Sequence, residues 1–199
     1  MGVLLVPFML RNPAFLWEAG LNTTDDTIWL PCYVFMGYLM NDFASLLRPM
    51  LQYGTTDDVL FVGHHVALLT TWASFYVDNW GHLFAVPTMI TELTAPFINA
   101  RVYMTHFGME ASVIYAINGL CAILTWYYLR MWMYCTILSF RIFGEFRQEL
   151  LDGPLLRNGL VTTAYLFGVI LQCFWCVLLT KGALSVLFGD NGKKKKKKG

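Results

Sequence analysis

Apolar residues gather in long stretches along this chain, and short polar turns separate them. A helix needs about 20 apolar residues to cross the hydrocarbon core of a bilayer. The stretches that meet or approach this length cover residues 28–47, 59–77, 82–103, 111–143 and 160–187. The pattern predicts an all-α, polytopic integral membrane bundle with five or six transmembrane helices.

The third and fourth stretches contain features that bend or divide a helix. Pro96 removes a backbone hydrogen bond and clashes with the carbonyl four residues earlier, so we expect a kink that exposes the carbonyl of Glu92. The stretch over 111–143 is too long for one upright span. It predicts either one tilted helix or two helices broken near Arg130.

The chain divides into three expected regions. Residues 1–27 form an N-terminal apolar segment, either a truncated first helix or an interfacial helix with Arg11 at its end. Residues 28–187 form the transmembrane domain, and residues 188–199 form a polar, lysine-rich tail. Within the domain, charged residues alternate with apolar ones over 141–157, which predicts an amphipathic interfacial helix that ends at Gly153.

Composition supports a membrane protein and argues against nucleic acid as a partner. The chain is 57% hydrophobic and 14% charged, whereas soluble domains have about a quarter charged residues. The net charge of +1 includes six lysines at positions 193–198, so the body is acidic. That tail fits a solvated end, a contact with anionic lipid or a dilysine retrieval signal.

The five cysteines all fall in apolar stretches, and their number is odd. Neither feature indicates a disulfide framework. Cys173 and Cys176 have the spacing of a redox or zinc motif, but no second pair of ligands accompanies them. We therefore interpret the cysteines as packing residues and expect no metal site.

Adjacent histidines, His64 and His65, lie inside an apolar stretch. An ionisable side chain at the centre of a bilayer costs roughly 2.5–3.5 kcal/mol on insertion scales, so such residues are functional candidates. Other polar candidates occur in the remaining stretches: Asp42, Glu92, Asn99, Arg101, Asn118 and Arg130. By contrast, His82 and His106 stand at loop edges, which is typical of ordinary interfacial residues.

These residue types can support acyl transfer or lipid binding. One of His64 and His65 would act as nucleophile or base, and Asp42 or Glu92 would orient its imidazole. The lipid head group would be held by the planar guanidinium of Arg101 or Arg130, with Asn99 and Asn118 in the same polar network. The alternative is that all these groups pair with one another and only fix the register of the helices.

The order and spacing of several motifs resemble the TLC-domain family, which includes ceramide synthases and a branch of smaller lipid-associated membrane proteins. The resemblance rests on Gly37-Tyr38 with Asp42, on His64-His65, on Thr91 to Arg101, and on Asn118-Gly119 followed by Arg130. Ceramide synthases carry a His-Asp-x-x-Asp element downstream of the paired histidines, and this chain has Glu92 to Arg101 in its place. The smaller branch is therefore the better match.

The resemblance implies a TLC-like fold that handles lipid acyl chains, by binding or sensing them or by histidine-dependent acyl transfer. As an enzyme the protein would be a lipid N- or O-acyltransferase with acyl-CoA as co-substrate and no bound cofactor. The alternative function is a non-catalytic accessory subunit of a larger membrane assembly. Membrane lipids are the expected partners, and the endoplasmic reticulum is the favoured membrane, with the mitochondrial inner membrane as the alternative.

Overall fold

The computed structural model describes residues 6–53 and 59–188, and every regular element within them is helical. The lysine run at 193–198 lies outside the described residues. The helices, in chain order, are α1 Val6–Arg11, α2 Phe15–Glu18, η2 Asp26–Ile28, α3 Trp29–Tyr53, α4 Val59–Asp78, α5 His82–Thr91, η3 Glu92–Thr94, α6 Ala95–His106, α7 Val113–Thr125, η4 Trp126–Leu138, η5 Arg141–Glu145, α8 Arg147–Asp152 and α9 Leu155–Phe188. The predicted all-α class is confirmed.

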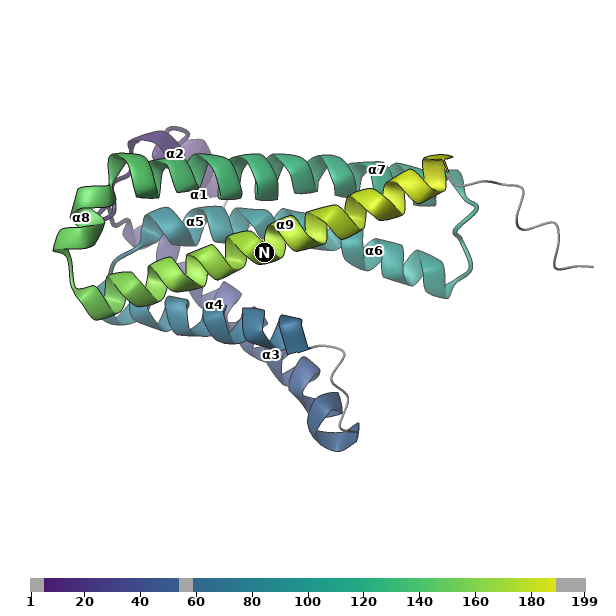
Figure 1. Cartoon of the computed structure of the whole chain (residues 1–199), viewed down its shortest axis with the longest axis horizontal. Coiled ribbons are helices and arrows are strands. Elements are labelled where there is room, and N and C mark those ends of the chain that lie inside the picture. The colour runs from purple at the N-terminus through teal and green to yellow at the C-terminus, as the bar shows by residue number, and fades with distance from the viewer. Residues whose placement is uncertain (1–5, 54–58, 189–199) are drawn as a thin grey trace, which may run out of the picture.

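The long helices pack side by side as a bundle (Figure 1). The helix from α7 to η5 runs along one side, α3 and α4 form the opposite side, and α9 crosses obliquely between them. At the centre lies α5, in which nine of ten residues are buried. A helix that is apolar on every face packs stably only when other helices surround it, so the composition of α5 explains its central position.

The helical path breaks where Pro96 predicts a kink. The α5 helix stops at Thr91, a 3₁₀ turn covers Glu92–Thr94, and α6 starts at Ala95. The carbonyl of Glu92, however, accepts a hydrogen bond from the backbone N–H of Ala95. The kink is confirmed, but our expectation of an exposed carbonyl is wrong because the tighter turn supplies a donor.

The fourth stretch is one continuous helical path rather than two helices. Its winding changes from α to π at Trp126 and stays wide through Leu138. Wide turns of this kind occur often at functional sites, and here they carry Arg130 into the bundle. The break that we considered near Arg130 is therefore a change of winding.

Two predicted boundaries differ from the structure. The amphipathic helix is shorter than expected, since α8 covers Arg147–Asp152 before the chain turns at Gly153. The last helix starts earlier, at Leu155, and is 34 residues long. The first difference lies at the start of the predicted helix, where the wide turn Arg141–Glu145 ends at Phe146 before α8 begins. The second follows from Pro154, which is compatible with the start of a helix.

The N-terminal segment forms short helices instead of a span. The α1 helix has six residues and α2 has four, too few to cross a bilayer. The rings of Phe8 and Phe15 meet edge to face at 5.0 Å and belong to the core. Through these rings the segment packs against the bundle near one of its ends (Figure 1).

Two helices in the described part of the chain are long and apolar enough, by length and composition, to cross a membrane: Val59–Asp78 and Leu155–Leu184. The other helices depart from that pattern for identifiable reasons. The α3 helix carries Asn41, Asp42 and Arg48, and the third and fourth paths are divided by their changes of winding. The count of five or six spans stays a prediction.

Candidate functional site

His65 and Asp42 form a close pair between α4 and α3. The His65 ring is buried, and its Nε2 lies 2.8 Å from Oδ2 of Asp42. Its Nδ1 lies 2.8 Å from the carbonyl oxygen of Phe61, one turn earlier on the same helix. Both ring nitrogens are therefore engaged. Of the two carboxylates predicted to orient an imidazole, the structure places Asp42 in that position and Glu92 elsewhere.

The hydrogen bonds of His65 determine how many protons the pair holds. A carbonyl oxygen only accepts, so Nδ1 must carry a proton and donate to Phe61. The contact at Nε2 then needs a second proton, either on the ring or on the Asp42 carboxyl group. In both cases the pair has no net charge, which suits its position between helices.

His64 lies in a different environment from its neighbour. Its ring meets Trp175 of α9 edge to face at 5.5 Å. It also meets the His65 ring, with centroids 5.7 Å apart. Within the described residues no hydrogen bond to either nitrogen of His64 is found. Neighbours on a helix point about 100° apart, and here that rotation separates a paired imidazole from an unpaired one.

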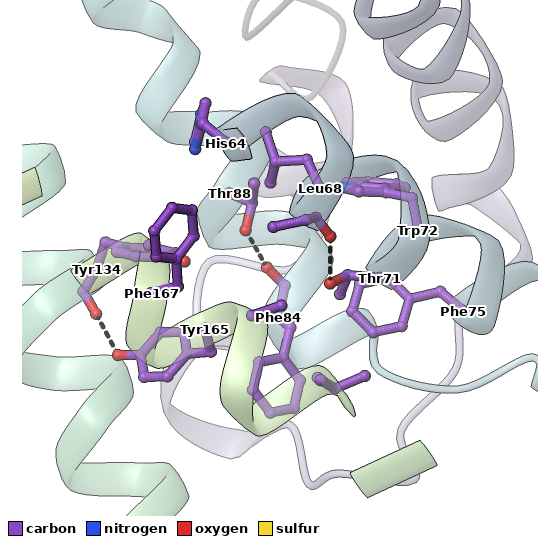
Figure 2. A pocket seen from close by; sticks show the side chains of 14 residues that line it. His64, Leu68, Thr71, Trp72, Phe75, Phe84, Thr88, Tyr134, Tyr165 and Phe167 are labelled. Atoms are coloured by element: carbon purple, nitrogen blue, oxygen red, sulfur yellow. Dashed lines mark hydrogen bonds between the residues drawn. The ribbon is translucent and has the colours of Figure 1, made fainter. Parts of the chain in front are cut away.

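His64 lines a cavity of about 30 Å³ between α4, α5, η4 and α9. Figure 2 shows Leu68, Trp72, Phe75, Phe84 and Phe167 around it. Three of the hydroxyl groups at its wall are committed elsewhere: Thr71 donates to the carbonyl of Ala67, Thr88 to that of Phe84 and Tyr165 to that of Tyr134. The cavity holds about two water molecules, so an acyl chain enters only if side chains move.

Arg130 forms a second polar cluster across three elements. Its Nε donates to Oγ1 of Thr94 at 2.8 Å, its Nη1 to Oε1 of Gln172 at 3.1 Å, and its Nη2 to Oε1 of Glu92 at 3.3 Å. The guanidinium also lies over the Trp126 ring, 4.5 Å from its centroid. With its side chain 8% exposed, Arg130 is fully engaged within the protein and is not available to a lipid head group.

The remaining candidates lie away from both clusters. Arg101 stacks on the Tyr115 ring at 4.0 Å, and the missing side chain of Gly119 leaves room for its guanidinium. Asn118 donates to the carbonyl of Phe97 at 2.8 Å, which ties α7 to α6. Asn99 is exposed. The structure therefore brings together the histidines with Asp42 and, separately, Glu92 with Arg130, while the other three lie outside.

The chain matches the TLC domain family over residues 1–181. It belongs to that family. TLC domain-containing protein 4-B of Xenopus laevis is similar to this chain, with 28% identity over 165 residues. The alignment covers 79% of this chain and 59% of that protein. The chain thus spans less than two thirds of the length of this relative. No solved structure matches it. TLC proteins are membrane proteins, which agrees with the two apolar helices.

Three residues of this TLC domain complete the Arg130 cluster although they are not among the site residues predicted from the sequence. Thr94, Trp126 and Gln172 surround Arg130. Gln172 had a signal, since it is a polar residue inside an apolar stretch. Thr94 and Trp126 had none, because both types are common in membrane helices.

Three of the clustered polar residues lie near the middle of their helical paths. Asp42 lies close to the middle of the 25-residue α3 helix, Glu92 lies near the middle of the α5 to α6 path, and Gln172 lies near the middle of α9. Among the described residues no group of three or more possible metal ligands is found. The TLC domain thus has two polar pairs, His65 with Asp42 and Arg130 with Glu92, and a third ionisable side chain, His64, that has no hydrogen-bond partner among the described residues and lies beside a small cavity.

Proposed function

We propose that this TLC protein crosses the membrane five times and binds the acyl chain of a membrane lipid between α4 and α9, beside His64. Short connections join the long helices, which favours antiparallel neighbours. The five passages would be α3, α4, α5 to α6, α7 to η5, and α9. The shortest of these paths, α4, covers 20 residues, about 30 Å of helix.

The observation that carries the proposal is a difference between the ionisable side chains: His65 and Arg130 have partners, and His64 lines a cavity instead. Asp42 neutralises His65, and Glu92 with Gln172 satisfies Arg130. His64 has no hydrogen-bond partner in the described part of the chain, and it faces an apolar cavity. A mostly apolar lining with a small number of polar groups is typical of sites that bind small hydrophobic ligands.

Phe167 is the side chain that must move for an acyl chain to enter. Its ring lies at the cavity wall beside His64 (Figure 2). It also fills the space over Gly63 of α4, where a Cβ atom would stand 3.7 Å from the ring. A rotation of Phe167 would join the cavity to the surface between the two helices without breaking a hydrogen bond.

A photocrosslinking experiment tests this site. Phosphatidylcholine with a diazirine in one acyl chain would be incorporated with the full protein into vesicles, and the labelled residues mapped by mass spectrometry. We expect labels on α4 and α9 around His64, and their loss in Phe167→Trp. Leu166→Trp is the matched control, because Leu166 is 44% exposed on the adjacent face. Equal labelling in both variants would refute the proposal.

Acyl transfer is a separate question, which the same purified protein can answer. Both nitrogens of His65 are engaged, so a base or nucleophile would have to be His64. The assay supplies acyl-CoA with sphingoid or lysophospholipid acceptors and compares the wild type with His64→Ala and His65→Ala. Our proposal expects no turnover. Turnover that disappears with His64→Ala would establish the acyltransferase instead.

A structural subunit is the second candidate, and the small cavity favours it. A subunit without a ligand would have an interior filled by side chains. The space left beside His64 is only about 30 Å³. Stable co-purification with other chains, together with no specific lipid label, would support this function. Of the two membranes considered, we favour the endoplasmic reticulum, and microscopy of the tagged protein against organelle markers tests that choice.

A further inference from the structure

One end of the bundle contains a buried histidine that the proposed lipid site does not use. His82, the first residue of α5, is 1% exposed. Its Nδ1 accepts a hydrogen bond from the backbone N–H of Asp25 at 2.9 Å. The ring also meets Trp29 edge to face, with centroids 5.1 Å apart. This bond joins the segment before α3 to the central helix.

The bond fixes the protonation state of His82. Because a backbone N–H only donates, Nδ1 must present its lone pair, and the ring is neutral with its proton on Nε2. A proton added to Nδ1 would make this nitrogen a donor that faces the Asp25 N–H, which is also a donor, and the contact would break. The buried Nε2 has no partner among the described residues, so it offers no bond that would compensate.

The bond to His82 is one of three that hold the N-terminal segment at this end. Trp80 donates from Nε1 to Oδ1 of Asn22 at 3.1 Å, and Arg141 donates from Nη1 to the carbonyl of Leu16 at 2.6 Å. Neither of these bonds involves a group that titrates between pH 5 and 8. Leu16 also forms part of the wall of a second small cavity, together with Arg141.

We propose that His82 is a proton-sensitive latch, which holds the segment from Leu16 to Asp25 against the bundle at neutral pH and releases it in mild acid. Asp25 and Asp26 are the charged groups that interact with the ring, and Tyr76 of α4 is the titratable residue against the same Trp29 indole. The two carboxylates favour a charged ring, but a protonated Nδ1 would face the Asp25 N–H inside a buried site, and this conflict is relieved when the segment moves away. Acid therefore stabilises the released state.

Hydrogen exchange at the Asp25 amide measures the latch directly. The full chain in lipid nanodiscs would be followed from pH 7.5 to 5.0, with rates expressed as protection factors. A released imidazole titrates near its ordinary pKa of about 6.5, so protection should fall about 30-fold by pH 5.0. His82→Asn is the matched control, since its Oδ1 replaces the Nδ1 acceptor and does not titrate.

The outcomes separate clearly. We expect a steep fall in the wild type, a flat profile in His82→Asn, and low protection at every pH in His82→Gln, which lacks an acceptor at the Nδ1 position. The same pH profile in the wild type and His82→Asn would overturn the latch, because it would assign the effect to Asp25 or Asp26. Should His82→Asn fold poorly, the ¹⁵N shift of Nδ1 in the wild type decides. A protonated Nδ1 at pH 7.5 contradicts the proposal.

Discussion

Replacement of Arg130 by Met should be among the most destabilising single changes in the bundle. The side chains of Arg130 and Glu92 are 8% and 16% exposed, so the change leaves a carboxylate without its partner in a water-poor interior. Removing one member of a buried ion pair costs about 3–5 kcal/mol, which corresponds to roughly 10²- to 10⁴-fold in the unfolding constant. Thr94 and Gln172 also lose a donor.

The double variant Arg130→Met with Glu92→Met should recover most of this loss. Once both charges are gone no uncompensated charge is buried, and such replacements are often close to neutral. We expect the double variant to lie within about 2 kcal/mol of the wild type, allowing about 1 kcal/mol for each lost hydrogen bond. Unfolding by SDS in mixed micelles, followed by the fluorescence of Trp126 and the other indoles, gives the four free energies of the cycle.

An additive cycle would refute this reasoning. If the double variant lost as much as the two single variants together, the Glu92 carboxylate would not depend on Arg130 for its stability. A cost below about 1 kcal/mol for Arg130→Met alone would be equally contrary, since it would mean that water reaches Glu92. Either result would mean that the Arg130–Glu92 ion pair does not stabilise the bundle.

Four further variants test the packing and the His65–Asp42 pair. Gly168→Ala should destabilise by about 1–3 kcal/mol, because its Cβ would stand 2.9 Å from the buried Tyr134 hydroxyl. Gly159→Ala on the same helix has open space and should stabilise by about 0.5–1 kcal/mol; SDS unfolding measures both. Asp42→Asn should cost less than Asp42→Ala, because the amide can donate to Nε2 of a neutral His65; equal losses would contradict the proton count.

The helices follow largely from the sequence, and their interruptions follow only in part. Residue patterns place the break at Glu92–Thr94 correctly because proline acts through local geometry. The wide winding from Trp126 to Leu138 has no such local signal. It depends on how Arg130 reaches partners on two other elements, and those partners lie 36 and 42 residues away along the chain.

The polar candidates show the same division between local and distant causes. An apolar context identifies Asp42, His65, Glu92 and Arg130, because charge at such depth is costly wherever the helices lie. Which carboxylate meets which cation depends on the packing of α3 against α4 and of η3 against η4, which no short motif encodes. His82 illustrates the limit: its place at a loop edge predicts an interfacial residue, but the N-terminal segment folds back and buries it.

His64 is the residue whose presence the fold explains least. Within each pair the two partners neutralise each other. His64 neutralises no partner, and its polar ring lies against Trp175 and the cavity. Phenylalanine would fill the same space without a polar group that lacks a hydrogen bond. His64→Phe should therefore fold with equal or greater stability in SDS unfolding. If the imidazole contacts a lipid ligand, the same variant should lose the specific crosslink. If His64 only stabilises the fold, the variant should lose stability and keep the crosslink.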